Sequence, residues 1–441
     1  MRIPPAGVSL DAAGMPPAPA PMARNPSLLR HMRWLDVVIF FGWVLSTSMP
    51  FGWAQPFRYL AAAYFVGAMV LFARQTMPSV MRAWPTLVIP RMCVISAIWA
   101  PDSSDAIRKG MLFALTAVAA IYTATRLSGR QILAVFLAAE IIAAAMTIMK
   151  PSIIGGAWTG IFGQKNFLAV HMFILYVSAL VIALDKGSNR WIRLIALGAV
   201  PVGMFVILMA KSATTTLLLI GGTAALLGHA FLWTPASRVR HMRTLLLLVM
   251  STLVICIVLL LFGLMQFDAE GKLLEALGKD STLTGRTYLW GLAERVMAEH
   301  PLTGVGAEGF WRAEYGAANS ITEYFFYESY VHFSFHNSYL ENGVAFGYPG
   351  YWFTVFLAGW AIFSASMNWI RNQTLINAAF LILAVMVIIR STAEIDLAVE
   401  FAGTAVLLFI GAIRREKPAR RPYGRTPAPL LKPRPMAPPA T

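Results

Sequence analysis

Twelve apolar stretches divide this sequence, and they constrain its fold more than any other feature. Each approaches the roughly 20 residues that an α-helix needs to cross the ~30 Å hydrocarbon core of a bilayer. The third and eleventh are short or have an arginine at one end, so we expect twelve helices, give or take one. The stretches run approximately over 34–49, 57–73, 87–100, 111–125, 132–149, 167–184, 192–210, 214–231, 244–267, 344–364, 375–389 and 397–413.

The composition agrees with a membrane protein. Hydrophobic side chains make up 58% of the chain and charged ones only 13%, whereas soluble domains average roughly 25% charged residues. A water-soluble core is therefore excluded. We predict an all-α polytopic membrane protein with a transmembrane domain of about twelve helices over residues 34–413.

The positions of the basic residues orient these helices. If the N-terminus lies inside, 23 of the 36 Lys and Arg residues fall in the inner segments, as the positive-inside rule requires. The Pro-rich segments 1–30 and 414–441 are predicted to be disordered cytoplasmic tails, and the first of them does not have the pattern of a cleaved signal. Both termini are thus expected in the cytoplasm.

One long hydrophilic loop, residues 268–343, separates the ninth stretch from the tenth and is expected on the outer face. It has eleven acidic and five basic residues, so it carries a net charge of −6 in a chain of net charge +15. Thr284 is a candidate N-cap for a helix that ends at Glu299, because the next residues are His300 and Pro301. Gly304 and the glycines after it then permit a tight turn. We expect the loop to fold into short helices.

Four cations are predicted at the outer ends of the helices or in this loop: Lys165, Lys211, Arg286 and Arg390. Arg286 falls in the first turn of the predicted loop helix, where the helix dipole does not favour a cation. A ring of such groups would suit a diphosphate. For each residue, contact with lipid headgroups is an equally good interpretation.

The segment FHNSYLENG precedes the tenth stretch. A short helix there would place His336 with Leu340 on one face, and Asn337 with Glu341 on another. His332 lies four residues before His336 and would share its face on a helix, but no convincing set of further metal ligands accompanies the pair, and we predict no metal site. Glu328, Glu341 and Glu394 would either orient a base, bind sugar hydroxyls or lie in solvent, and we prefer the last interpretation.

Three motifs together resemble the superfamily of O-antigen ligases and Wzy-type polysaccharide polymerases. They are GIFGQKNFLA, the run TGRTYLWGLAERVMAEHPLTGVGAEGF and HNSYLENGVAFG. The segment ISAIWAPDSSDAIRKG is most similar to the ExoQ-like exopolysaccharide polymerase branch. The resemblance extends roughly from Trp99 to Gly350, and the O-antigen ligase-like region is expected over about 200–360.

The resemblance implies a metal-independent, inverting glycosyltransferase without a cofactor in the bacterial inner membrane. Its donor would be an oligosaccharide on undecaprenyl diphosphate, used at the periplasmic face. The family's loop histidine corresponds to His336 and its loop arginine to Arg286, and a second loop arginine corresponds to either Arg295 or Arg312.

Histidine suits the deprotonation of an acceptor hydroxyl, and preplaced cations stabilise the departing diphosphate. We therefore predict His336 as the base or acceptor-orienting group, and Arg286 with Lys165, Lys211 and Arg390 on the diphosphate. Asn337 and Glu341 are weaker candidates for contact with sugar.

The expected reaction joins lipid-linked repeat units into exopolysaccharide. The partners would be the lipid-linked donor, a glycan acceptor, membrane lipids, and a chain-length regulator with an export complex, but not nucleic acid. A ligase that transfers glycan to lipid A core would use the same residues. A polysaccharide transporter or flippase and a non-catalytic scaffold remain alternatives from other classes.

Overall fold

The computed structural model describes residues 26–49, 52–236, 239–245, 248, 252, 285–324, 326, 333–397 and 399–415. It is mostly helical. Its α-helices are α1 (Pro26–Ser48), α2 (Gln55–Leu71), α3 (Ala73–Arg82), α4 (Val88–Ser96), α5 (Ser103–Arg126), α6 (Gly129–Met149), α7 (Lys165–Leu184), α8 (Arg190–Met209), α9 (Ala213–Gly228), α10 (Thr234–Ala236), α13 (Arg286–Glu299), α14 (Gly316–Tyr324), α15 (Ser338–Arg371), α16 (Leu375–Ser391) and α17 (Gly403–Ile413).

Short elements connect some of these helices. Three are single 3₁₀ turns, and a π-helical turn, η4 (His229–Trp233), continues α9 into α10. A two-stranded antiparallel hairpin of β1 (Ile153–Ile154) and β2 (Ala157–Trp158) follows α6. The 3₁₀ turns are η1 (Gly52–Ala54), η2 (Trp84–Leu87) and η3 (Gly160–Phe162).

The sequence itself marks several helix starts with capping residues. Asp102 accepts hydrogen bonds from the backbone of the first turn of α5, and Thr374 does the same for α16. Ser128 and Gln131 form a reciprocal capping box at the start of α6. Such side chains satisfy backbone N–H groups that have no partner inside the helix.

The predicted number of twelve membrane-spanning helices is not confirmed. Within the described residues, six helices are long and apolar enough to span a bilayer, namely α5, α6, α7, α8, α15 and the run from α9 to α10. A seventh would be the pair α2 and α3, which bend by 106° at their junction. The ninth predicted stretch lies almost wholly outside the described residues.

Helix length explains part of the difference. Helices α16 and α17 have 17 and 11 residues, which at about 1.5 Å per residue are shorter than the ~30 Å core. The sequence pattern predicts that the last span begins at residue 397, but residues 397 and 399–402 are not helical and α17 begins only at Gly403. Helix α17 is buried among its neighbours over almost its whole length.

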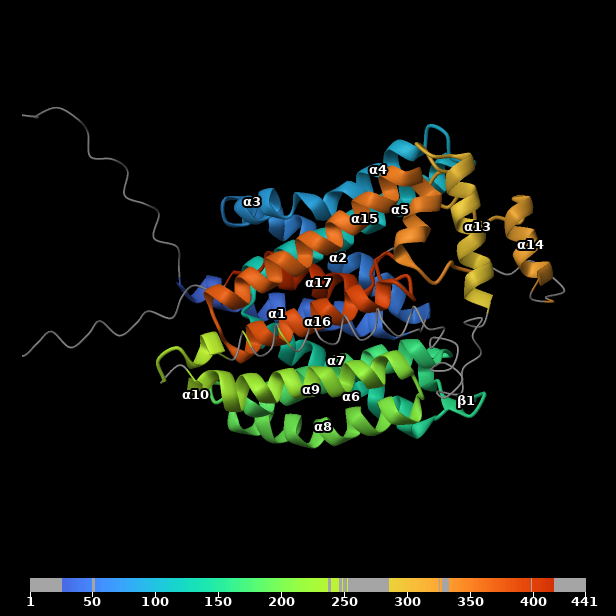
Figure 1. Ribbon diagram of the computed structural model, residues 1–441. Helices are drawn as coiled ribbons and strands as arrows, with labels where there is room; N and C mark the ends of the chain where they lie inside the picture. The colour runs from blue at the N-terminus through green and yellow to red at the C-terminus, as the bar shows by residue number, and fades with distance from the viewer. Residues whose placement is uncertain are drawn as a thin grey trace, which may run out of the picture.

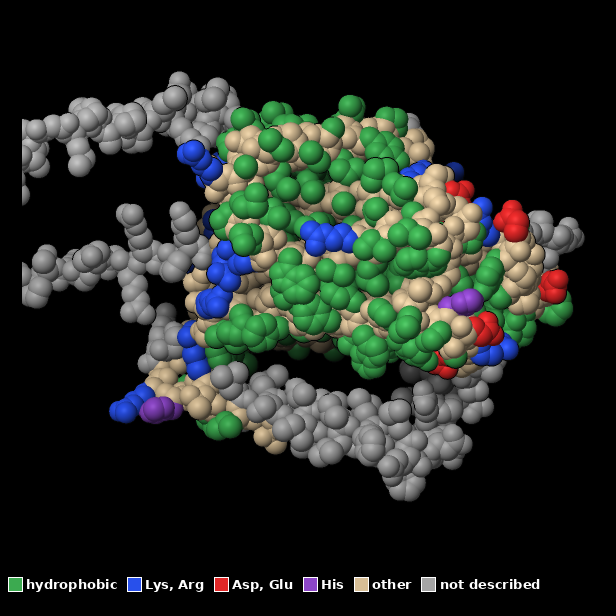
Figure 2. Space-filling view, turned by 90° about the horizontal axis from the view of Figure 1, so that it is seen from above, with side chains coloured by type: hydrophobic (Ala, Val, Ile, Leu, Met, Phe, Trp, Pro, Cys, Tyr) green, Lys and Arg blue, Asp and Glu red, His purple; other side chains and the backbone are tan. Residues whose placement is uncertain are grey.

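The long helices pack side by side into one bundle (Figure 1). Helices α13 and α14 run across one end of it, which we call the loop end. Helix α1 begins and α17 ends at the opposite end (Figure 1). In Figure 2, Lys and Arg side chains gather at the opposite end, whereas Asp and Glu side chains appear at the loop end. A mostly apolar surface, in which Lys or Arg side-chain atoms are also visible, separates the two (Figure 2).

The loop has a hydrophobic core of its own, built on α13. Leu289, Ala293 and Val296 of this helix pack against Phe310, Trp311, Ile321 and Phe335. Helix α13 ends at Glu299, as the His300-Pro301 pair predicts. Leu340 and Val344 of α15 complete this core, so the loop is held on the first turns of α15.

Two of the motifs interlock where the loop meets α15. Helix α15 is interrupted at Gly347 (φ 70°), and Pro349 has no N–H to offer to the helix. The N–H groups of Val305 and Gly306 donate instead to the carbonyl groups of Val344 and Ala345, at 2.9 and 3.0 Å. Tyr348 N–H in turn donates to the carbonyl of Pro301 at 2.8 Å. The HPLTGVG motif therefore replaces the hydrogen bonds that the break in α15 leaves open.

Gly304 is required for this close approach. Its φ is +61°, and a Cβ at this position would lie 2.4 Å from backbone atoms of residues 344–346. Only glycine avoids both the steric clash and the backbone strain.

Candidate functional site

A buried carboxylate at the loop end contacts both residues that the motifs single out, His336 and Arg286. Glu394 lies in the connection between α16 and α17 and is 4% exposed. Its Oε1 accepts hydrogen bonds from Asn166 Nδ2 at 2.7 Å and from Arg286 Nη2 at 3.1 Å. His336 Nδ1 lies 3.3 Å from its Oε2. We call these four residues the Glu394 cluster.

Arg286 reaches the cluster from the start of the loop helix. It is the first residue of α13, and the N-cap is Gly285 (φ 81°) and not Thr284 as the sequence suggested. Its side chain is 20% exposed, so one side of the guanidinium group pairs with Glu394 while another remains accessible. A cation at this position gains nothing from the helix dipole, but the buried carboxylate stabilises it.

His336 does not lie on a helix, which differs from the expected stacking with Leu340. Helix α15 begins only at Ser338, because Asn337 is its N-cap and accepts hydrogen bonds from Tyr339 N–H and Leu340 N–H. His336 precedes it with φ 48°, a conformation that is uncommon for residues other than glycine and that is often found at functional sites. This backbone turn directs the imidazole, 28% exposed, to Glu394.

The tautomer of His336 follows from this contact. With the proton on Nδ1, the imidazole donates to Glu394, and Nε2 keeps its lone pair to accept a proton. The carboxylate therefore fixes both the orientation of the ring and the nitrogen that remains basic.

Neighbouring residues hold Glu394 in place. Ser338 donates from its N–H and its hydroxyl group to the backbone carbonyl of Glu394, at 3.1 and 2.9 Å. Asn166 in turn accepts from the hydroxyl of Ser212 at 3.1 Å. The cluster, with Ser212 and Ser338, thus joins α7, α13, the starts of α9 and α15, and the connection between α16 and α17.

Arg390, expected among the diphosphate contacts, is 2% exposed. Its Nε donates to Asp396 Oδ2 at 2.9 Å, and its Nη1 donates to the carbonyl of Asn166 at 3.3 Å. The guanidinium group is thus engaged inside the protein, next to the Glu394 cluster and not on its accessible side. In this position, the guanidinium group of Arg390 is not placed to contact a bound ligand directly.

Lys165 and Lys211 stand at the rim of the same region and are exposed. Lys165 is the first residue of α7 and precedes Asn166 of the cluster. Lys211 (φ 49°) lies between α8 and α9 and precedes Ser212. Each lysine is thus next in the sequence to a residue of this network, and neither has a hydrogen-bond or ion-pair partner among the described residues.

The charge state of Glu394 follows from its surroundings. Burial by itself would raise the pKa of this carboxyl group, but its hydrogen bond to His336 and the charges of His336, Arg390 and Arg286 hold the pKa below its ordinary value. Glu394 is therefore an anion at neutral pH. This contradicts the interpretation of Glu394 as a solvated surface carboxylate.

A cavity of about 410 Å³ adjoins the cluster. Ser334 and Ile395, close in the chain to His336 and Glu394, contribute to its wall. Two aromatic side chains and four carboxylates also line it: Trp311, Phe333, Asp105, Glu308, Glu341 and Glu400. Its volume lies in the range typical of small-molecule sites.

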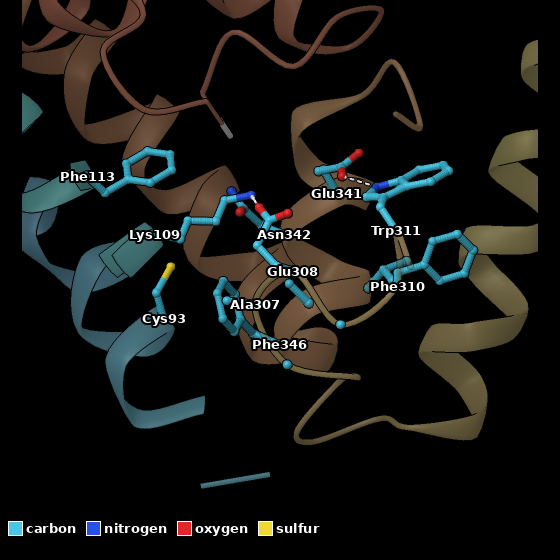
Figure 3. Close-up of a pocket in the computed structure, with 14 residues that line it drawn as sticks. Cys93, Lys109, Phe113, Ala307, Glu308, Phe310, Trp311, Glu341, Asn342 and Phe346 are labelled. Atoms are coloured by element: carbon cyan, nitrogen blue, oxygen red, sulfur yellow. Dashed lines mark hydrogen bonds and ion pairs between the residues drawn. The ribbon is translucent and has the colours of Figure 1, made fainter. Parts of the chain in front are cut away.

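Figure 3 shows a neighbouring pocket, which shares Lys109, Glu308, Trp311 and Glu341 with this cavity. Lys109 of α5 points to Glu308, with which it forms an ion pair, and Glu341 accepts a hydrogen bond from Trp311 Nε1 at 2.5 Å. Glu341 also accepts from Phe335 N–H at 2.9 Å. Of the two weaker sugar-binding candidates, Glu341 thus lines the cavity, whereas Asn337 caps a helix.

The two candidates for a second loop arginine lie apart from the cluster. Arg312 pairs with Asp105 and Asp102 at the start of α5, at 3.6 and 3.9 Å. Arg295 is exposed on α13. His332 and Glu328 lie outside the described residues.

Sequence reasoning missed several polar residues that the fold buries. Asp396 pairs with Arg390, and Glu140 in α6 pairs with His171 of α7 at 3.0 Å. A signal was available for Glu140, since an acidic residue inside an apolar stretch is costly unless it has a partner. For Asp396 the signal was its position shortly after the eleventh apolar stretch.

Comparisons with known proteins agree with the motifs. Residues 199–355 match the O-antigen ligase family. Over 372 residues the chain is 26% identical to the exopolysaccharide production protein ExoQ of Rhizobium meliloti (strain 1021), an alignment that covers 77% of this chain and 82% of that protein. With its apolar helices, the chain is a multi-pass membrane protein. The resemblance to the O-antigen ligase and Wzy-type polymerase superfamily, and to its ExoQ-like branch, is thereby confirmed.

Proposed function

We propose that this protein is an inner-membrane glycosyltransferase that joins lipid-diphosphate-linked oligosaccharide units into exopolysaccharide. The observation that carries the proposal is the Glu394 cluster, in which one buried carboxylate holds an imidazole and a guanidinium group beside a polar cavity. The similarity to an exopolysaccharide production protein supports the same class of reaction. In this proposal the loop end faces the periplasm, and both termini are cytoplasmic.

His336 acts on the acceptor. Its Nε2 accepts the proton of a sugar hydroxyl as that oxygen attacks the anomeric carbon of the donor. Glu394 accepts a hydrogen bond from Nδ1 and stabilises the imidazolium that forms. General-base catalysis of this kind contributes typically 10²–10⁴-fold.

Arg286 acts on the leaving group. As the bond between the anomeric carbon and the phosphate oxygen breaks, its electron pair passes to the lipid diphosphate, which departs as an anion. The accessible side of the guanidinium group stabilises this charge, with Lys165 and Lys211 at the rim. A single displacement inverts the anomeric centre, and no metal or cofactor is needed.

Arg390 has a positioning role in this scheme. Its pairing with Asp396 and with the carbonyl of Asn166 fixes the connection that carries Glu394, and Glu394 in turn positions the ring of His336. This replaces the expectation that Arg390 itself contacts the diphosphate.

The adjoining cavity suits the acceptor sugar. Carboxylates accept hydrogen bonds from sugar hydroxyls, and Trp311 and Phe333 offer apolar surfaces for the faces of sugar rings. The carboxylates outnumber Arg108 and Lys109 there, so a neutral saccharide is favoured over one that carries acidic groups.

The test is reconstitution in liposomes with a synthetic oligosaccharide on undecaprenyl diphosphate. We expect longer lipid-linked chains with the wild-type protein and at least a hundredfold slower extension with His336→Ala. Arg286→Ala should also slow extension, whereas Arg295→Ala, an exposed neighbour on α13, should not. Unchanged extension by folded His336→Ala protein would refute the proposal.

A second candidate is transfer of a finished glycan to lipid A core, which the name of the matching family favours. The same residues would serve a different acceptor. Supplying lipid A core to the same liposomes distinguishes the two reactions, because a ligase would convert it to a larger glycolipid while the repeat units stay unextended.

A further inference from the structure

Three arginine side chains meet at the end of the bundle opposite the Glu394 cluster. Arg82 ends α3, Arg371 lies in the last turn of α15, and Arg415 follows α17. Together they line a hollow of about 230 Å³. Figure 2 shows Lys and Arg side chains gathered at this end of the bundle.

These three cations lack a counter-anion within the described part of the chain. None of the ion pairs there involves Arg82, Arg371 or Arg415. The positive charges of Arg82 and Arg415 repel one another. Arg82 Nε is buried and makes no hydrogen bond within the same residues, which is costly for a charged group. The arrangement is therefore incomplete without an anion.

The flank of the hollow is apolar and open to the surroundings of the bundle. Met81, Trp84 and Phe363 line it and are 72%, 49% and 66% exposed. A free phosphate ion would use the arginines but leave these side chains uncovered. A phospholipid would use both, since its acyl chains cover the apolar flank while its headgroup meets the cations.

We propose that this hollow is a binding site for an anionic phospholipid, with the two-phosphate headgroup of cardiolipin as the best match to three guanidinium groups. Arginine engages phosphate oxygens in two-pronged fashion, and basic pockets between membrane helices on the cytoplasmic side bind such headgroups. The site requires that the protein lie in a bilayer, but it does not depend on glycosyl transfer.

Native mass spectrometry of the full-length protein in detergent, titrated with cardiolipin, tests the site. Removing the three charges together (Arg82→Gln, Arg371→Gln and Arg415→Gln) should weaken cardiolipin binding roughly a hundredfold, because each basic residue near an anionic lipid contributes about fivefold. The matched control removes three exposed arginines at the same end, in the variant Arg33→Gln, Arg74→Gln, Arg190→Gln. We expect its binding to stay within about fivefold of wild type.

Several outcomes would overturn the proposal. Equal losses in the two triple variants would indicate general surface attraction, and full competition by inorganic phosphate would indicate a free-anion site. Glu416 follows Arg415 in the sequence and lies outside the described residues. A gain of tenfold or more in Glu416→Gln would mean that this carboxylate neutralises the arginines. If the triple variant does not fold, Arg415→Gln alone should weaken binding about fivefold.

Discussion

Replacing Glu394 by glutamine tests the proposed orientation of His336 with almost no change in shape. Oε1 of Glu394 accepts from two donors, Asn166 and Arg286, whereas Oε2 meets only His336 Nδ1. The amide oxygen of glutamine will therefore take the Oε1 position. In the reverse orientation its NH₂ group would face two other donors, Asn166 Nδ2 and Arg286 Nη2. In the preferred orientation the NH₂ group faces His336, and Nδ1 can only accept. The proton moves to Nε2, which can no longer act as a base.

The size of this effect follows from the tautomer. In a Ser-His-Asp triad, the equivalent change of carboxylate to amide leaves the geometry intact and lowers kcat about 10⁴-fold. The contact of 3.3 Å in this protein is longer than a strong charged hydrogen bond, so we expect a loss of about 10²–10⁴-fold, or roughly 3–5 kcal/mol in the activation barrier.

The assay is single-turnover extension of a lipid-linked oligosaccharide in liposomes with saturating donor. Glu294→Gln, which alters an exposed carboxylate on α13, is the matched control and should keep wild-type activity. If folded Glu394→Gln protein extends chains within about threefold of the wild-type rate, well short of the range for general-base catalysis, Glu394 does not set the tautomer of a catalytic His336.

Three further predictions concern stability. Arg390→Met should lower the free energy of unfolding by about 3–5 kcal/mol, because Asp396 is left as an unpaired buried charge. Chemical denaturation should show this loss. The double variant Arg390→Met, Asp396→Leu should recover most of the lost stability. A direct role of Arg390 on the diphosphate would instead raise KM without loss of stability. Gly304→Ala should destabilise the protein by at least about 1–3 kcal/mol, because the position has a positive φ and the added Cβ would clash with backbone atoms of α15. The control Gly291→Ala, on the open surface of α13, should be neutral or stabilising by up to about 1 kcal/mol. Equal melting temperatures of the two variants would contradict the close packing on α15. The pKa of Glu394 is lowered in the folded state, so the stabilising contribution of its ionised form is present above the ordinary value of 4.5 and is lost as the pH falls below it. The difference in melting temperature between wild type and Glu394→Gln should therefore shrink as the pH falls below about 4.5. A difference that already disappears at pH 6 would contradict the lowered pKa.

Local and periodic features could be predicted from the sequence alone. Apolar stretches of bilayer length determine that the chain is helical and enters a membrane, because backbone groups in lipid must be satisfied within the helix. The His300-Pro301 pair determines where α13 ends, since proline restricts the residue before it. The order of the loop motifs likewise indicated the resemblance to the O-antigen ligase and Wzy-type polymerase superfamily, and this resemblance pointed to His336 and Arg286.

The tertiary structure decided which charges face one another, because such pairs form between residues far apart in the chain. Glu394 and His336 are separated by 58 positions, and Glu394 and Asn166 by 228, so no spacing rule relates them. For the same reason, the sequence treated Arg390 as a free cation, whereas its pairing with Asp396 engages it inside the protein. Composition set the number of basic residues, but only the packing of α3, α15 and α17 brings three arginines together without a carboxylate among the described residues.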